Sequence, residues 1–342
     1  MTASLCLCGP VAVAQESEEG SQADAKVIAV ADAAFKGWTV RGRPIWVVVA
    51  LENRAEERTV LLEVGSPTAR SEVVVDLARG ARKTVGLLAP ATSIGDVKVN
   101  VLDAKTRERL FTTSARTRLR DRAESVVAYM GKRPPGLRAP EERNDGIDAF
   151  DLPWEEQRKH TARMTPRLLP ESWLAYSGVD ALYWPAPQWD RLTAPQARAL
   201  ETWVLTGGHL VVAVDDGWRA LADHELSRLL PALPTGVDVV DNPEELAAYL
   251  GPSTSLGRES AFGEQMQALP ASLPVLRVEP RAGSAPFVSF NDTLPFGHSW
   301  PVGDGRVSLL RTRIAATGRT PSHDDWTAWT VGKTRPRMPE VY

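Results

Sequence analysis

The hydrophobic pattern of this sequence changes near residue 120, and this change constrains the fold more than any other feature. Before it, short strand-like runs recur roughly every ten to fifteen residues, with turn residues between them and no helical period. After it, strand-like runs alternate with helix-like runs. We therefore expect two domains, residues 26–118 and 125–315, joined by a charged linker at residues 119–124.

The first domain is predicted to contain about seven short strands. Residues 44–51 are apolar at nearly every position, which is typical of a central strand that is buried on both faces. Val97, Val99 and Val101 alternate with polar residues, as they would in a strand with one buried face. This density of strands favours an immunoglobulin-like β-sandwich. The cysteine pair that is usual in that fold is missing from these residues, so the prediction concerns the architecture alone.

The second domain is predicted to alternate strands with helices. Thr193 has the residue type of a helix cap, and Gly207-Gly208 would end that helix. Residues 210–214 then form an uninterrupted apolar run, which predicts a buried strand. We expect a mostly parallel sheet with helices on both faces. Two segments are expected to be irregular: a long surface loop at residues 131–160 and a loosely ordered tail at residues 316–342.

The first 14 residues have the pattern of a signal peptide. Residues 5–13 are a short apolar stretch, and Ala12-Val13-Ala14 matches the A-x-A pattern of a cleavage site. No basic residue precedes the stretch, so either the true start lies upstream or the signal is a weak one. We expect export to the periplasm or another extracytoplasmic location, with residues 15–25 as a disordered mature N-terminus. The alternative is a frayed, disordered N-terminus without export.

Both cysteines, Cys6 and Cys8, lie inside the predicted signal peptide. Each follows a leucine, where a lipoprotein signal needs a small residue, so we expect cleavage rather than lipid attachment. Cleavage would leave no cysteine for a disulfide, a metal site or thiol catalysis. The sequence has no run of about 18 or more apolar residues, so it predicts no transmembrane helix.

No motif predicts a cofactor, a metal or a nucleic acid. The five histidines do not have the spacing of a zinc site. The G-x-S-x-G turn of serine hydrolases, the Walker A loop and a G-x-G-x-x-G loop after a strand are all missing from the sequence. The net charge is -3, which provides no positive field for nucleic acid. We therefore expect no cofactor and no nucleic-acid partner.

Three segments of the second domain carry a resemblance to a known family. They are residues 169–182, Gly207-Gly208-His209-Leu210-Val211-Val212 and Val302-Gly303-Asp304-Gly305-Arg306-Val307. Together they resemble the class I glutamine amidotransferase-like domains found in periplasmic regions of bacterial membrane proteins. The resemblance covers residues 125–314 and implies a flavodoxin-like sheet. In such proteins a sandwich domain often comes first and transmembrane helices often follow, so this chain is expected to be a shorter version or to lack a membrane segment.

The resemblance does not extend to the catalytic nucleophile. Amidotransferases of this class carry a cysteine on a sharp turn between a strand and a helix. Residues 210–214 are expected to be the corresponding strand here, and the turn after it reads Asp215-Asp216-Gly217. A carboxylate cannot perform thiol chemistry. The resemblance therefore implies the fold of the family without its activity, and we predict that the protein is not an enzyme.

Two candidate ligand sites follow from this interpretation of the second domain. Asp215, Asp216 and Gly217 lie where open α/β sheets bind ligands, beyond the carboxyl end of a strand. They would hold a polar ligand or a divalent metal, unless a carboxylate caps the next helix and Gly217 eases the turn. Trp184, with nearby tryptophans and tyrosines, would line a glycan-binding or protein-binding face, unless these rings pack in the core.

The functional hypothesis is a non-catalytic protein-interaction or ligand-sensing module of a membrane-associated bacterial protein. Its partners would be proteins at or in the inner membrane. One alternative is a metal-dependent hydrolase that uses Asp215 and Asp216. The other alternative is the binding of cell-wall glycan through the aromatic cluster around Trp184.

Overall fold

The computed structural model describes residues 27–66, 69–90, 95–120, 125–131, 159–214, 217–241, 272–290 and 294–312. Several predicted features lie outside these ranges: the signal peptide and mature N-terminus, most of the loop at residues 131–160, the tail, Asp215 and Asp216.

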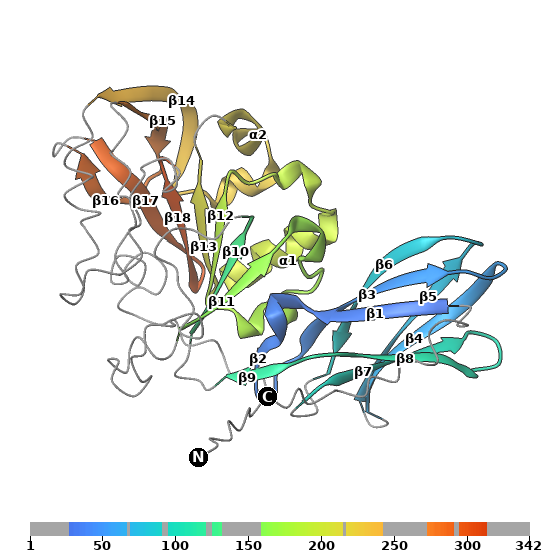
Figure 1. Ribbon diagram of the computed structural model, residues 1–342. Helices are drawn as coiled ribbons and strands as arrows, with labels where there is room; N and C mark the ends of the chain where they lie inside the picture. The colour runs from blue at the N-terminus through green and yellow to red at the C-terminus, as the bar shows by residue number, and fades with distance from the viewer. Residues whose placement is uncertain are drawn as a thin grey trace, which may run out of the picture.

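The described part of residues 27–115 forms two antiparallel sheets that pack face to face (Figure 1). One sheet has the order β1 (Val27–Ala33), β3 (Ile45–Asn53), β6 (Arg82–Ala89). The other has the order β5 (Ala69–Leu77), β4 (Arg58–Ser66), β7 (Val97–Asp103), β8 (Arg109–Ala115). Alternating side chains from both sheets, among them Val49, Leu62 and Val101, meet in one apolar core. We call this part the N-terminal sandwich.

The described part of residues 125–312, the C-terminal module, is built on a seven-stranded mixed sheet. Its order is β11 (Lys159–Met164), β10 (Ser125–Met130), β12 (Ala181–Pro185), β13 (His209–Ala213), β18 (Gly305–Leu310), β17 (Leu294–Val302), β16 (Ala285–Phe290). The first five strands are parallel to one another, and β17 and β16 complete the sheet in antiparallel pairing. β14 (Ala232–Asp241) and β15 (Ser272–Pro280) form a separate antiparallel pair. Residues 242–271 lie between the two strands in sequence, and we call the pair the β14–β15 hairpin.

Helix α1 (Ala194–Leu205) packs on one face of this sheet. The Thr193 side chain accepts a hydrogen bond from the backbone N–H of Gln196, and the Gln196 side chain accepts one from the backbone N–H of Thr193. This reciprocal cap begins the helix at the position that the sequence indicates. Leu200, Trp203 and Val204 form its buried face, which contacts the centre of the sheet.

The predicted fold class, an immunoglobulin-like sandwich followed by a flavodoxin-like, mostly parallel sheet with helices on both faces, is wrong. The described residues are mainly β-strand, and most of their sheets are antiparallel. The α-helices of the described residues are α1 and the short α2 (Trp218–Ala222), and the other helical turns are 3₁₀. On the face of the sheet opposite α1, the core contains Leu273 and Val275 of the β14–β15 hairpin. That hairpin occupies a position where the prediction requires a helix.

The physical reason for the error lies between residues 218 and 241. The spacing of the leucines suits one helix over residues 218–230, but the His224 ring accepts a hydrogen bond from the backbone N–H of Leu226 at 3.1 Å and begins a separate 3₁₀ turn, η8 (Glu225–Leu229). Residues 232–241 then form a ten-residue strand that pairs antiparallel with β15. A strand partner so far along the chain leaves no signal in the local pattern.

The core of the C-terminal module includes buried residues from the sandwich side, among them Phe35, Trp38 and Trp46, whereas the interior of the sandwich is a cluster of its own. The connection between β1 and β3 consists of η2 (Ala34–Gly37) and β2 (Trp38–Val40), and we call it the connecting segment. Phe35 of this segment is 1% exposed, and its ring lies 5.4 Å from the ring of Tyr176 in η6 (Trp173–Gly178). The Tyr176 ring in turn stacks on Trp203 of α1 at 5.2 Å. Aromatic side chains therefore link the sandwich to the helix layer of the module.

The connecting segment also covers the edge strand β11. Trp38 stacks on His160 of β11 with 3.8 Å between ring centroids. The backbone N–H of Phe35 donates to the sulfur of Met164, at the end of the same strand. Gly178 permits the close approach, because a Cβ there would overlap the carbonyl oxygen of Trp38. β11 is the end strand of the seven-stranded sheet, and the connecting segment packs against its side chains.

We predict that Phe35→Ala destabilises both parts of the protein together. Removal of a fully buried phenylalanine ring costs about 3–5 kcal/mol. Urea unfolding followed by far-UV circular dichroism and by tryptophan fluorescence should show one transition, shifted equally in both signals. Val30→Ala is the control, because Val30 is 63% exposed on β1 and its loss should change stability by less than about 0.5 kcal/mol. Two separate transitions, of which only one shifts, would contradict this packing between the two parts.

Candidate functional site

The structure describes two of the four predicted site residues, Gly217 and Trp184. Asp215 and Asp216 lie outside the described residues, so their geometry stays a prediction. Gly217 is exposed at the start of α2 with open space around it. Trp184 is 2% exposed and packs in the core beneath α1. Gly217 is therefore accessible to a ligand, whereas the ring of Trp184 has no free face.

Three of the other four aromatic residues predicted to form this cluster are core residues, and the fourth, Trp173, is partly buried against the same core. Trp189, Tyr176 and Tyr183 are buried, and Trp189 packs against His224 with 5.6 Å between ring centroids. A sugar-binding platform needs exposed ring faces, and the rings of Trp184 and these three residues do not provide them. Half-buried Trp218 is different: the guanidinium of Arg219 lies 4.9 Å from the centre of its ring.

The carboxyl edge of the parallel strands nevertheless has an unusual backbone at its centre. The chain leaves β10 toward β11 on one side and later adds β12 on the other, so the order of strands reverses between β10 and β12. Such a switch point is where open sheets leave room for a ligand. Gly131, just after β10, has φ 72°, and Ala186, just after β12, has φ 46°. The segments that follow β10 and β12 therefore both turn through the left-handed region of backbone conformation at the switch point.

Ala186 is the less expected of the two residues, because its Cβ disfavours this conformation. Its backbone N–H donates to the carbonyl oxygen of Ala213 at 2.7 Å, which holds the turn against β13. Ala186 itself is exposed, and the following Pro187 is buried. Strained backbone of this kind often marks a binding site. No sequence signal indicates it, since alanine between two prolines is ordinarily extended.

The β14–β15 hairpin lies over the other half of the same edge. The backbone N–H of Leu276 in β15 donates to the carbonyl oxygen of Arg311, just after β18. The Arg311 guanidinium donates back through Nε to the carbonyl oxygen of Leu276 at 2.6 Å and through Nη1 to that of Pro295 at 3.0 Å. One buried cation thus fastens β15 to the sheet.

Asp238 on the hairpin, and Arg311 and His298 on the neighbouring sheet, have shifted pKa values. Asp238 of β14 forms a bidentate ion pair with Arg277 of β15, which holds the pKa of Asp238 below its usual value. Burial lowers the pKa of Arg311, an effect that the nearby Asp238 partly opposes. His298 of β17 is 3% exposed, and burial followed by the charge of Arg311 lowers its pKa from the usual 6.5.

A chain of buried polar side chains crosses the sheet on the face opposite α1. His209 Nε2 lies 2.9 Å from Ser308 Oγ, and Ser308 donates to Ser299 Oγ at 3.2 Å. His209 and Ser308 are both buried within the strands, away from the carboxyl edge. The arrangement satisfies buried polar groups within the core, so we assign it a structural role.

The described residues contain no group of three or more histidine, cysteine or carboxylate side chains that could hold a metal ion. None of the helices in the described ranges is both long enough and apolar enough to cross a bilayer.

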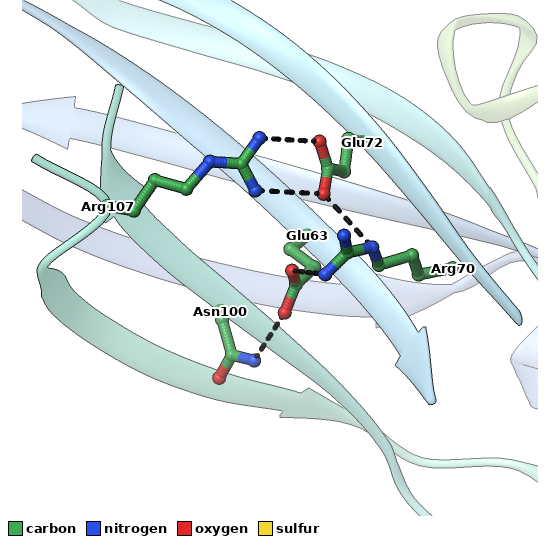
Figure 2. Close-up of polar contacts among 5 residues, drawn as sticks. All are labelled: Glu63, Arg70, Glu72, Asn100 and Arg107. Carbon is green, nitrogen blue, oxygen red and sulfur yellow. Dashed lines mark hydrogen bonds and ion pairs between the residues drawn. The ribbon is translucent and has the colours of Figure 1, made fainter. Parts of the chain in front are cut away.

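The outer face of the four-stranded sheet in the sandwich carries a network of charges (Figure 2). Glu63 of β4 and Glu72 of β5 are directly opposite each other, an arrangement that repels. Arg70 lies within 3.2 Å of both carboxylates, and Arg107 pairs with Glu72 at 3.3 Å. Asn100 of β7 donates to Glu63 at 3.3 Å. The two carboxylates and two guanidinium groups of this network balance in charge.

Comparisons with known proteins do not place the chain in a family. No protein-family model matches it, and no curated protein matches its sequence. Among solved structures it is similar to an exo-β-1,4-mannosidase from Opitutaceae bacterium strain TAV5, with 16% identity and a TM-score of 0.31 over 58% of this chain and 32% of that one.

A second similar structure is a cycloisomaltooligosaccharide glucanotransferase from Paenibacillus sp. in complex with cycloisomaltoheptaose. It has 10% identity and a TM-score of 0.21, over 55% of this chain and 28% of that one. This chain therefore spans about a third or less of the length of each structure. Likeness at this level carries no argument about function.

We predict that Ala186→Val lowers the free energy of unfolding by about 1–2 kcal/mol, because a β-branched side chain is more strained at positive φ. Ala186→Gly should change it by less than about 0.5 kcal/mol, since relief of strain offsets the added freedom of the unfolded chain. Chemical denaturation measures both. Ala50→Val is the matched control, at an exposed position in extended strand β3, and should be neutral or slightly stabilising. Equal losses at both positions would argue against a strained turn.

We predict that Arg70→Ala destabilises the sandwich more than an ordinary surface ion pair would. Its removal leaves Glu63 and Glu72 facing each other without the cation that bonds to both. We expect a loss of about 1 kcal/mol that becomes smaller at high salt, measured by urea unfolding. Arg82→Ala is the control: Arg82 forms one pair with Glu52 and is 79% exposed, so its loss should be smaller. Equal effects of the two variants would show that the network adds nothing.

Proposed function

We propose that this chain is an exported, non-catalytic interaction module that binds an extended segment of a partner protein along strand β14. The observation that carries the proposal is the state of that strand. Among the described strands β14 pairs with β15 alone, so its outer edge lacks a strand partner. Val237 and Val239 on this strand are 37% and 66% exposed, whereas Leu273 and Val275 of the same hairpin are buried.

An extended peptide is the partner that fits such an edge. Its own N–H and C=O groups complement those along the outer side of β14, as in proteins that bind a peptide by adding a strand to a sheet. Natural edge strands are usually protected by lysine, proline or a covering element. The outer half of β14, residues 237–241, contains neither lysine nor proline. Alternate apolar residues of the partner would contact Val237 and Val239.

Charge gives a further preference for the partner. The Asp238 carboxylate is already paired with Arg277 inside the hairpin. Asp241 is exposed at the end of β14. A basic residue near one end of the partner segment would complement Asp241, which favours a fixed register for the added strand.

The packing between the two parts gives the proposed interaction a rigid support. Phe35 and Tyr176 hold the sandwich against the C-terminal module, so a partner on β14 would be kept at a set distance from the sandwich. A module that positions one protein relative to another needs this rigidity. We assign that positioning role to the sandwich.

The sequence supports a non-catalytic role outside the cytoplasm. The resemblance to class I glutamine amidotransferase-like domains comes without the cysteine nucleophile, and the turn has Asp215-Asp216 in its place. The signal-peptide pattern at residues 1–14 supports export, and the resemblance supports partners at or in the inner membrane. We propose no cofactor for this role.

We predict that a photo-crosslinking amino acid at exposed Thr235 of β14 captures a discrete partner in cells that make the protein. Mass spectrometry of the adduct should place the crosslink on one extended segment of that partner. A synthetic peptide of this segment should bind the purified protein, and Val239→Lys should weaken its Kd at least about tenfold, because a charge would face the apolar contacts.

The control position is Val30 of the sandwich, which is exposed to a similar degree as Val239. A crosslinker at Val30 should not give the same adduct. The same adduct from both positions, or a peptide Kd that Val239→Lys leaves unchanged, would refute docking on β14.

A further inference from the structure

The backbone of Leu276 in β15 shows which groups of β14 face the outer edge of the hairpin. The Leu276 N–H donates to the carbonyl oxygen of Arg311 at 2.6 Å, and its own carbonyl oxygen accepts from Arg311 Nε at 2.6 Å. Both groups therefore point away from β14. Val237 is the cross-strand partner of Leu276. Opposite residues of an antiparallel pair either bond to each other or turn their backbone groups outward, so those of Val237 face away from β15.

Two neighbouring positions of β15 agree with this alternation. Pro274 lies opposite Val239 and has no N–H to donate to β14. The carbonyl oxygen of Arg277, next to Leu276, accepts a hydrogen bond from Thr235 Oγ1 of β14 at 3.3 Å, so this carbonyl group faces β14. The backbone groups of β15 thus point toward β14 and away from it in turn.

Three residues of β14 therefore present backbone N–H and C=O groups at its outer edge: Val237, Val239 and Asp241. Their side chains lie on one face of the strand, and all three are exposed. At the other end of the strand, Pro234 has no N–H, and the register shifts between Pro234 and Gly236. The regular edge available to a partner is therefore about five residues long, over residues 237–241.

The open face of this edge favours one direction for an added strand. Parallel strands occur almost only where both faces of a sheet are covered, whereas antiparallel strands tolerate water on one face. The side chains of Val237 and Val239 are 37% and 66% exposed, so one face of β14 is open. Antiparallel pairing is also slightly more stable per residue. The edge is therefore suited to an antiparallel strand.

We propose that β14 binds its partner as an antiparallel strand with the pattern basic-x-apolar-x-apolar, read from the amino to the carboxyl end. The basic residue lies opposite Asp241, and the two apolar residues lie opposite Val239 and Val237. These three partner residues exchange backbone hydrogen bonds with β14, whereas the x residues turn their backbone groups away. The inference rests on the proposed docking along β14 and adds the direction, the register and the sequence class of the partner segment.

Amide hydrogen exchange of the full chain, resolved by residue with NMR, tests the outward groups before any partner is added. The N–H groups of Val237 and Val239 should exchange at least about tenfold faster than those of Asp238 and Val240, which bond to β15. Equal protection or the reverse alternation would overturn the assignment. Protection of Val237 and Val239 that rises with protein concentration would place a second copy at the edge and contradict a separate partner.

A synthetic peptide, Lys-Thr-Val-Thr-Val with Gly-Ser at each end, tests the direction when it is titrated onto the chain at millimolar concentration. N-methylation of its two valines should weaken the Kd at least about tenfold, whereas N-methylation of its two threonines, the matched control, should change it less than about threefold. The order Val-Thr-Val-Thr-Lys should bind more weakly. No binding, a larger effect of the threonines or a preference for the reversed order would overturn the proposal.

A charge reversal tests the register. Asp241→Lys should weaken binding of the lysine peptide about three- to tenfold and favour the same peptide with glutamate in place of lysine. Asp32→Lys, at an exposed aspartate of β1, is the control and should change neither affinity. Equal effects of the two variants would contradict the register.

The two proposals fail in different ways. A partner crosslinked from Thr235 whose segment lacks this pattern would contradict the inference and leave docking on β14 intact. The lack of any discrete adduct at Thr235 would contradict the docking itself.

Discussion

The packing of Phe35 and Trp38 against the C-terminal module is the interaction on which the rest of the structure depends. These two side chains leave the sandwich, cover the edge strand β11 and reach the aromatic rings beneath α1. Without them, the buried side chains of Met164 on β11 and of Tyr176 would face water. A few residues of the sandwich side therefore complete the module's core, although the sandwich keeps a core of its own. A rigid relation between the two parts follows from ordinary hydrophobic burial.

The elements that local signals determine were predicted well, and those that depend on distant partners were not. Thr193 and Gly207-Gly208 mark the ends of α1, and the apolar run at residues 210–214 corresponds closely to β13 (His209–Ala213). The pattern indicates strands at residues 237–240 and 275–278, within β14 and β15, but it does not show that the two pair antiparallel with each other, because they lie far apart in the chain. That one omission is enough to replace an expected helix layer with strands.

The candidate site shows the same division between local and tertiary information. A sequence pattern can point to the carboxyl edge of a strand, but it cannot show that Trp184 is turned into the core. Neither the left-handed backbone of Ala186 nor the burial of Arg311 has a local cause. Both arise because neighbouring strands supply the carbonyl oxygens that receive their hydrogen bonds. Such features become visible only once the strand order is known.

Strand β2 of the connecting segment pairs in parallel with β9 (Arg118–Arg120), through which the chain leaves the sandwich for the second time. The two crossings between the parts of the protein thus lie side by side as a small ribbon (Figure 1). A single linker can bend and twist, whereas two linkers paired by hydrogen bonds resist torsion. A pull applied to one part would load the hydrogen bonds of this ribbon together, so tension would pass through the protein with little change in shape.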